Sequence, residues 1–499
     1  MAATDAGMIA QHEAARGGGL KPVLLALFLF AVLLPIRFHV GDFRVDPFRI
    51  YLLAGFIPMA IMMLSGRAGR LTLVDGLMVA YALWIVVALT HNHGNWGITN
   101  GGITVAELLG GYMLGRLMIR SVADFDRLVR YLIASLVVIL PFVVHEFVTG
   151  RWLIGELLRP IAPVGPEHSG ERLGFTRVQA GFPHPILYGL YASITFACAY
   201  YLYRDRVGVM LRRVAFVGVM TFAALSSGPL LSLFVQGGMI VWDRITRGKW
   251  MLLGVLAVIG YVVVDFLSNR TPVQIFVQTF TLNPTTAYWR IHIFEYGKQA
   301  VLNNPIFGIG HHDHPRPFWL TSSVDNFWLL NAMRYGLVGF GFLAGAMLLN
   351  VLNILRLENL SQAARNARLA YLVSFAGLAF TLTTVHVWNS VSSMVFVIFG
   401  AGAFLYTGGA GGPAAEAGSD AGGDSAPAAG AARYRRPTPA GPGHSRPAPQ
   451  PHPQAPPRPD SQPEPRPTPP RHARRDGASG DAGDAPPAAP RRKGPTYRR

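Results

Sequence analysis

Three histidines stand close together in the segment His311-His312-Asp313-His314. A neutral imidazole beside a hydroxyl group can accept its proton, so His311, His312 and His314 are each candidates for a general base. The same cluster also invites interpretation as a metal site. Adjacent side chains of one loop rarely all reach one ion, however, and no second group of ligands with suitable spacing occurs elsewhere. The sequence therefore favours a proton acceptor, or a plain polar loop, over a metal centre.

Arginine is the second residue type with an evident chemical use. A guanidinium group holds phosphate through paired, charge-assisted hydrogen bonds. Arginines gather in three segments between apolar stretches, at 37–49, 151–177 and 268–324. We expect arginines of these segments to hold an anionic ligand such as a phosphate. The alternative is that they pair with lipid headgroups or with nearby acids, namely Asp42, Asp46, Glu156, Glu171 and Glu295.

An amphipathic helix is predicted inside the third segment. Asn283-Pro284 is a suitable helix start, and Asn303-Asn304-Pro305 is a suitable end. Its turn-rich continuation, 307–310, contains a lone Gly-x-Gly that follows no strand and is therefore no nucleotide motif. One face of the helix is expected to carry Trp289, Ile293, Tyr296 and Ala300, and a different face Tyr288, His292 and Glu295.

The next predicted helix begins at Asp325-Asn326. Asn331 and Arg334 are three residues apart and so share one face of it. If this helix spans a bilayer, Arg334 lies within the membrane, where an arginine is a functional candidate that points into a polar cavity. Snorkelling towards the membrane surface, or a structural ion pair, is the alternative.

The whole chain of 499 residues is apolar, with 51% hydrophobic residues, 14% charged residues and a mean hydropathy of +0.31. Lipid must therefore cover much of it. Near Tyr406 the long apolar runs end, and Gly, Ala, Pro and Arg take over. The net charge of +17 does not indicate nucleic acid as a partner, because no basic patch lies in a nucleic-acid-binding motif. Cys198 is the only cysteine, which excludes disulfides within the chain.

We expect an all-α membrane protein of about twelve transmembrane helices. Loops rich in Lys and Arg alternate with neutral loops, which places both termini in the cytoplasm and the three arginine-bearing segments on the opposite side. The first apolar run lacks a cleavage site and is expected to be an anchor. The predicted divisions are a cytoplasmic N-terminus at 1–19, helices 1–9 at 20–267, a large outer loop at 268–325, helices 10–12 at 326–407, and a disordered Pro/Arg-rich cytoplasmic tail at 408–499. The predicted helices are at 20–36, 48–65, 71–90, 102–119, 128–149, 183–203, 211–226, 229–242, 250–267, 326–353, 368–387 and 391–407.

Two patches carry a family resemblance. The first comprises Tyr288-Trp289-Arg290, the segment 304–310, Asp325-Asn326 and the segment 335–339, and the second is the segment 177–185. Together they resemble the O-antigen ligase/polymerase family of bacterial membrane glycosyltransferases. The resemblance implies a GT-C-like protein of the bacterial inner membrane, with its site facing the periplasm and with neither a metal nor a nucleotide cofactor. Its implied partners are an undecaprenyl-pyrophosphate-linked glycan, membrane lipid and other polysaccharide-assembly proteins.

By this resemblance, Arg177 and Arg290 match the family's loop arginines, which hold pyrophosphate. Negative charge accumulates on the departing pyrophosphate, so fixed guanidinium groups stabilise the transition state more than the ground state. Further candidates for binding the pyrophosphate or the glycan are Arg44, His184, Asn326 and Arg334.

The ligases of this family carry a His-Asn pair where this chain has Asp325-Asn326. We therefore expect a polysaccharide polymerase, with Asp325 or one of His311, His312 and His314 as the base. One alternative is a ligase that transfers a finished glycan to lipid A-core. An alternative of another class is a secondary transporter of an anionic solute, although the two halves of the chain show no convincing repeat.

Overall fold

The structure is a computed structural model of the chain, and it describes residues 20–41, 43–168, 170–268, 275 and 284–407. The described residues all belong to one compact unit. The predicted N-terminus at 1–19 and the predicted tail at 408–499 lie outside the described residues.

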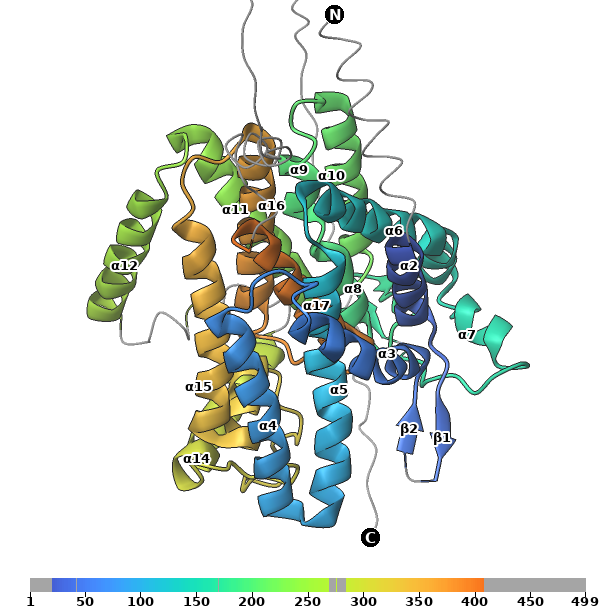
Figure 1. The fold of residues 1–499 in the computed structure, drawn as a ribbon. Coiled ribbons are helices and arrows are strands. Elements are labelled where there is room, and N and C mark those ends of the chain that lie inside the picture. Colours follow the sequence, from blue (N-terminus) through green and yellow to red (C-terminus); the bar gives the residue numbers. More distant parts are fainter. Residues whose placement is uncertain (1–19, 42, 169, 269–274, 276–283, 408–499) are drawn as a thin grey trace, which may run out of the picture. The chain divides into compact units, whose positions relative to one another are not determined.

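The first helices coincide with the predicted apolar runs (Figure 1). Thr72 and Asp75 form a capping box at the start of α4, and Ser121 caps α6. The predicted helices at 71–90 and 102–119 left a gap that the structure does not have, because α4 and α5 form a tight hairpin in which Gly94, at φ 59°, makes the turn. The helices are α2 (Leu20–Leu33), α3 (Pro47–Leu64), α4 (Leu73–His93), α5 (Asn95–Met118) and α6 (Val122–Thr149).

The predicted helix at 183–203 is two helices in the structure, α8 (Pro185–Ser193) and α9 (Phe196–Tyr201). Gln236 of the neighbouring α11 (Ser227–Thr246) occupies the break between them. Its side-chain amide donates to the carbonyl of Ser193 at 3.0 Å, and its Oε1 accepts from the amide of Ala197 at 2.9 Å. The prediction of one continuous helix was wrong because an apolar run does not reveal a glutamine that replaces backbone hydrogen bonds from another helix.

The remaining elements are helices and two short hairpins. Strand β1 (Phe38–Val40) pairs antiparallel with β2 (Phe43–Val45), and β3 (Glu171–Arg172) pairs antiparallel with β4 (Phe175–Thr176). The helices are α7 (Leu153–Leu158), α10 (Val207–Phe222), α12 (Trp250–Leu267), α14 (Pro284–Asn303), α15 (Phe327–Leu355), α16 (Gln362–Thr381), α17 (Asn389–Ala401) and the 3-10 turn η1 (Gly402–Leu405).

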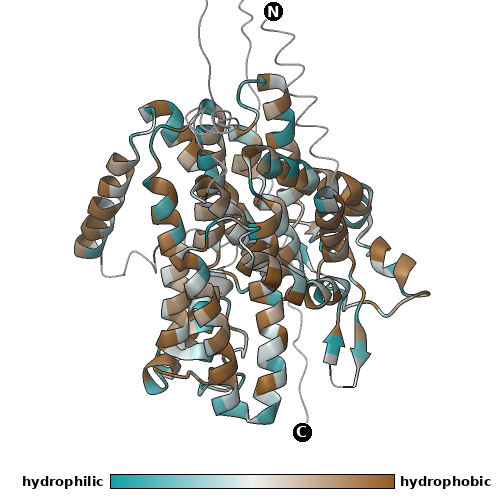
Figure 2. Ribbon diagram, in the orientation of Figure 1, coloured by the Kyte–Doolittle hydropathy of each residue, from teal (hydrophilic) through white to brown (hydrophobic). Residues whose placement is uncertain are grey.

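Among the described residues, 5 helices are long and apolar enough to cross a membrane, namely α3, α4, α6, α12 and α15. Helix α12 has no buried residue and is hydrophobic along its length (Figure 2). A helix with apolar side chains on every face is stable only where lipid or protein covers them. These helices indicate a helical, membrane-embedded protein. The count of twelve spans stays a prediction.

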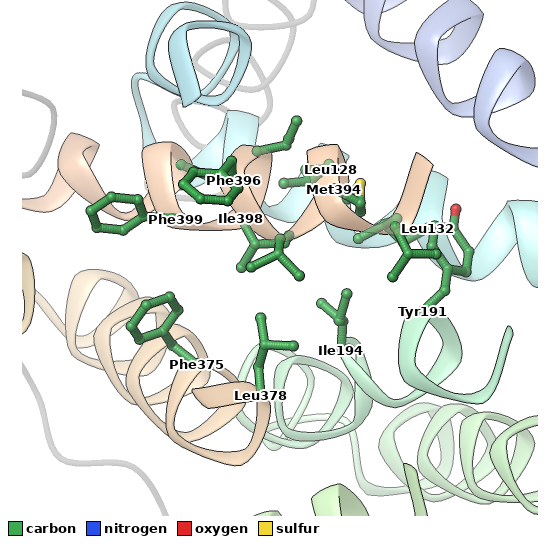
Figure 3. Close-up of a cluster of buried hydrophobic side chains, with 14 of the residues drawn as sticks. Leu128, Leu132, Tyr191, Ile194, Phe375, Leu378, Met394, Phe396, Ile398 and Phe399 are labelled. Atoms are coloured by element: carbon green, nitrogen blue, oxygen red, sulfur yellow. The ribbon is translucent and has the colours of Figure 1, made fainter. Parts of the chain in front are cut away.

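Helix α17 lies in the core, and every residue from Asn389 to Ala401 is buried. A Cβ atom at Gly115 of α5 would lie 2.1 Å from the carbonyl oxygen of Val397 in α17, so the two backbones touch. Glycines permit this approach, as is common between membrane helices. Apolar side chains of α17 join a cluster with those of α6, α8 and α16 (Figure 3), including Leu128, Leu132, Tyr191, Phe375, Leu378, Met394, Phe396 and Phe399.

Helix α14 occupies the range predicted for the amphipathic helix. Ile293 and Ala300 are buried in a cluster with residues of α15, and Trp289 and Tyr296 pack against it. Tyr288, predicted for the other face, is 55% exposed. The predictions of this helix and of its packed face are confirmed.

Candidate functional site

The segment 304–310, which leads from α14 to the histidines, docks on a break in α15. Gly336 has φ 69° and ψ 179°, so the helix is interrupted there. Carbonyl and amide groups that a break exposes inside a membrane need other hydrogen-bond partners, and here the docked loop supplies them. Three backbone hydrogen bonds join the two parts: Ile309 N to Met333 O at 2.7 Å, Gly310 N to Arg334 O at 3.1 Å, and Leu337 N to Pro305 O at 2.7 Å.

Two glycines make this docking possible. A Cβ atom at Gly336 would lie 1.9 Å from the carbonyl oxygen of Ile306, and one at Gly308 would lie 2.4 Å from that of Met333. Both glycines also have a positive φ, which side-chain-bearing residues rarely adopt. The glycines of the motif therefore bring the loop backbone directly against α15.

The docked loop and α15 line an open cavity of about 270 Å³, which we call the histidine cavity. His311, His312, His314 and Arg334 all line it, so the structure brings these sequence-predicted residues together. Two residues at the end of α4 bind the docked loop by hydrogen bonds. The amide of His311 donates to Nε2 of His93 at 2.8 Å, and Nε2 of His312 lies 3.1 Å from the carbonyl of Asn92.

A second group, which we call the arginine cluster, consists of Arg172, Arg177, His184 and Arg290. Burial, and then the charge of Arg172, lowers the pKa of Arg177 to about 10. Burial also lowers the pKa of Arg290, on which Asp325 and Arg172 act in opposite directions. Arg172 therefore lies within electrostatic range of both Arg177 and Arg290.

His184 is neutral in this cluster. Burial, followed by the charges of Arg177, His168 and Arg172, lowers its pKa to about 3. Its Nδ1 accepts a hydrogen bond from the amide of Ile186 at 3.1 Å and so caps α8. A protonated Nδ1 could not accept this bond, so the cap requires the neutral ring.

Two arginines of the cluster lack the acid partners that other arginines of the chain have. Arg151 pairs with Glu156 at 3.0 Å, and Arg159 pairs with Glu167 at 2.8 Å. Neither Arg172 nor Arg177 forms an ion pair with an acid in the part of the chain that the structure describes, and Nε and Nη2 of Arg177 are buried there without a hydrogen-bond partner. Burying an uncompensated guanidinium group is unfavourable, so an anionic ligand would complete this cluster.

Glu146 of α6 fixes the backbone beside Arg177. Its two carboxylate oxygens accept from the amides of Gln179 at 2.7 Å and Ala180 at 3.0 Å. Ala180 has φ 49°, a left-handed conformation that such contacts help to hold. The sequence analysis did not single out Glu146. An acid inside a long apolar run is the signal that could have revealed it.

His386 and Trp388, in the loop between α16 and α17, connect the arginine cluster with the surroundings of Arg334. The rings of His386 and Trp388 have centroids 5.8 Å apart, and the rings of Trp388 and His184 have centroids 5.9 Å apart. Burial, and then the charge of Arg334, lowers the pKa of His386 to about 3. The sequence analysis missed His386 because it placed the residue inside a helix at 368–387, whereas α16 ends at Thr381.

Three further predicted residues have other surroundings. Asp325 follows Val324 of the cavity wall, accepts from Oγ of Ser323 at 2.9 Å and acts electrostatically on Arg290. Asn326 caps α15, with its Oδ1 accepting from the amide of Leu329 at 3.0 Å. Arg44 forms an ion pair with Asp46 at 2.7 Å and a hydrogen bond with Asn389, so its guanidinium group already has an acid partner.

Comparisons with known proteins add no family to this picture. Within the described ranges, no group of 3 or more His, Cys, Asp or Glu side chains is arranged to hold a metal ion. No protein-family model matches the chain, and no curated protein gives a significant match.

Proposed function

We propose that the chain is a metal-independent membrane glycosyltransferase of the O-antigen ligase/polymerase type, which polymerises repeat units of an exopolysaccharide or O-antigen. The donor would be a glycan linked to undecaprenyl pyrophosphate. The observation that carries the proposal is the arginine cluster, in which Arg172 and Arg177 have no acid partner among the described residues. A pyrophosphate would supply the negative charge that these half-buried groups lack.

The proposed topology has twelve spans in a bacterial inner membrane, with both termini in the cytoplasm and the arginine cluster facing the periplasm. The alternation of basic and neutral loops supports this orientation. The apolar helices α3, α4, α6, α12 and α15 support embedding in a membrane. A lipid-linked donor would then reach the cluster from the surrounding bilayer.

In the proposed reaction, a hydroxyl of the acceptor sugar attacks the anomeric carbon of the donor. The bond from that carbon to the pyrophosphate oxygen breaks, and its electron pair leaves with undecaprenyl pyrophosphate. Arg172, Arg177 and Arg290 would stabilise the charge that develops on this oxygen. The proton of the hydroxyl would pass to Asp325 or to a histidine of the histidine cavity. Asp325 is a candidate for this function because it follows Val324 of the cavity wall and acts electrostatically on Arg290.

The proposal is tested by complementing a deletion strain with Arg177→Ala and Arg177→Lys variants. We expect the alanine variant to make no long polymer, and the lysine variant to make little, because a point charge does not replace two directed donors. Arg151→Ala is the matched control, since Arg151 belongs to the same outer segment but already pairs with Glu156. Normal polymer length and amount in the Arg177→Ala strain, at normal protein levels, would refute the proposal.

The same strains separate polymerase from ligase. Loss of a polymerase leaves single repeat units on the lipid carrier, whereas loss of a ligase leaves long carrier-linked polymer together with free lipid A-core. Gel analysis of lipid extracts distinguishes the two. Uptake of an anionic solute by the purified protein in liposomes would instead favour a transporter.

A further inference from the structure

The histidine cavity has walls of two kinds. Its lining includes the apolar side chains of Ile309, Leu330 and Met333, and it also includes three histidines and Arg334. A sugar ring likewise has apolar and polar parts, with C–H groups on its faces and hydroxyl groups around its rim. Pockets for drug-sized ligands have volumes of roughly 300–1,000 Å³. A cavity of about 270 Å³ therefore suits a ligand of about one sugar ring.

The cavity has an excess of positive charge. Asp313 is the only acid on its wall, and its carboxylate is already bound by Arg316 and by the amide of His314 at 3.0 Å. Arg334 has no ion pair with an acid in the described ranges. His311 is an exposed residue, but desolvation, and then the charge of Arg334, lowers its pKa to about 4, so its ring is neutral near pH 7. Arg334 is thus a cation without an acid partner in the described ranges, beside the neutral ring of His311.

We propose that the histidine cavity binds a sugar that carries a carboxylate, such as a hexuronate of the acceptor glycan, with the carboxylate on Arg334. The inference rests on the proposed function and names the class of the acceptor sugar. A guanidinium group holds a carboxylate through two parallel hydrogen bonds. Nε2 of His314 is buried and has no hydrogen-bond partner in the described part of the chain, so a ring hydroxyl can bind there.

Other ligands fit this cavity less well. A pyrophosphate carries more charge than a single arginine balances, and the arginine cluster offers three guanidinium groups. A neutral sugar would leave Arg334 without a counter-charge on a helix that is apolar enough to cross a membrane, which is unfavourable. A carboxylate matches the single charge of Arg334 and leaves the histidines to bind the hydroxyl groups.

The test measures binding of sodium glucuronate, glucose and inorganic phosphate to the full chain in nanodiscs, by isothermal titration or saturation-transfer NMR. Glucuronate and glucose share one ring and differ at the carboxylate. We expect glucuronate to bind at least about tenfold more tightly than glucose, as one charge-assisted hydrogen-bond pair allows. Arg334→Gln should abolish that preference, Arg334→Lys should retain part of it, and Arg151→Gln, remote from the cavity, should leave it unchanged.

Equal binding of glucuronate and glucose, or a preference that survives in Arg334→Gln, would overturn the inference. So would phosphate binding that depends on Arg334 as strongly as glucuronate binding does. The outcome is separable from that of the proposed function. Loss of polymer in Arg177→Ala together with no glucuronate preference would remove only the acceptor assignment. Normal polymer in Arg177→Ala would remove the polymerase on which the assignment rests.

Discussion

Replacing Gly336 with alanine should separate the loop 304–310 from α15. The new Cβ atom would lie 1.9 Å from the carbonyl oxygen of Ile306 and 2.8 Å from that of Pro305. Both are backbone atoms, so no side-chain rotation relieves the overlap. The positive φ of Gly336 adds strain of roughly 1–2 kcal/mol for a residue with a Cβ atom.

The expected magnitude follows from the contacts that the loop would lose. Three backbone hydrogen bonds join it to α15, and each contributes about 0.5–1.5 kcal/mol net. Together with the backbone strain, the substitution should cost about 3–6 kcal/mol. That is a large part of the roughly 5–15 kcal/mol by which folded proteins are usually stable. If the loop detaches while the rest of the protein stays folded, His311 would still be displaced from Arg334.

The buried Cys198 provides the assay, because it is the only cysteine of the chain. A thiol-reactive dye labels it only when the helices around it open, so labelling during heating reports unfolding. We expect Gly336→Ala to be labelled at a clearly lower temperature than the wild type, or to remain folded and make no polymer. Gly341→Ala is the matched control, since Gly341 lies in the same helix and a Cβ atom there meets nothing within 4 Å.

A Gly336→Ala protein with the labelling temperature of Gly341→Ala and with normal polymer would refute this reasoning. It would mean that the loop has a second docked position that tolerates a side chain. The close approach of Gly308 to Met333 would then be the contact to examine, because it lies on the other side of the same backbone pairing.

Three further predictions concern the groups that hold the site. Glu146→Gln turns an amide donor towards the backbone amides of Gln179 and Ala180, so the free energy of unfolding should fall by about 1–3 kcal/mol. The polymer should also become shorter, because Arg177 shifts. Unchanged polymer would contradict the positioning role of Glu146. Gln236→Leu should lower the labelling temperature of Cys198 by leaving groups of the α8–α9 break unpaired, while Gln299→Leu, on the exposed side of α14, should not. His184 has a pKa of about 3 in the folded protein and of about 6.5 in the unfolded chain. Between these pH values the unfolded chain binds a proton at His184 and the folded protein does not, so acidification from pH 6.5 to pH 3 should progressively destabilise the protein. His184→Asn keeps a capping group without titrating, so its thermal unfolding followed by tryptophan fluorescence should depend less on pH; equal dependence would exclude His184 as a source.

The sequence predicted the elements whose signals are local. Apolar runs marked the helices, and α14 was located to its ends because Pro284 and the Asn303-Asn304-Pro305 sequence are strong helix boundaries. Its packed face followed from helical spacing alone. The break between α8 and α9 escaped the prediction, since it depends on Gln236 of another helix.

The candidate site was predictable in its residue types but not in its arrangement. Arginines in outer segments were recognisable as a group, yet only the structure separates Arg177 from Arg44, which already has Asp46 as its partner. No local pattern predicts whether an arginine meets an acid that is distant along the chain. His386 was hidden for a related reason, because the apolar pattern continues past the end of α16.

The arginine cluster and Arg334 are joined through His184, Trp388 and His386, whose imidazoles stay neutral because burial and the neighbouring guanidinium groups lower their pKa values to about 3. Neutral rings separate the charges without adding repulsion between them. In the proposed reaction this arrangement lets a pyrophosphate and a carboxylate bind at the same time, each on its own guanidinium groups. In that reaction Asp325, which follows Val324 of the cavity wall and acts electrostatically on Arg290, would accept the proton of the acceptor hydroxyl.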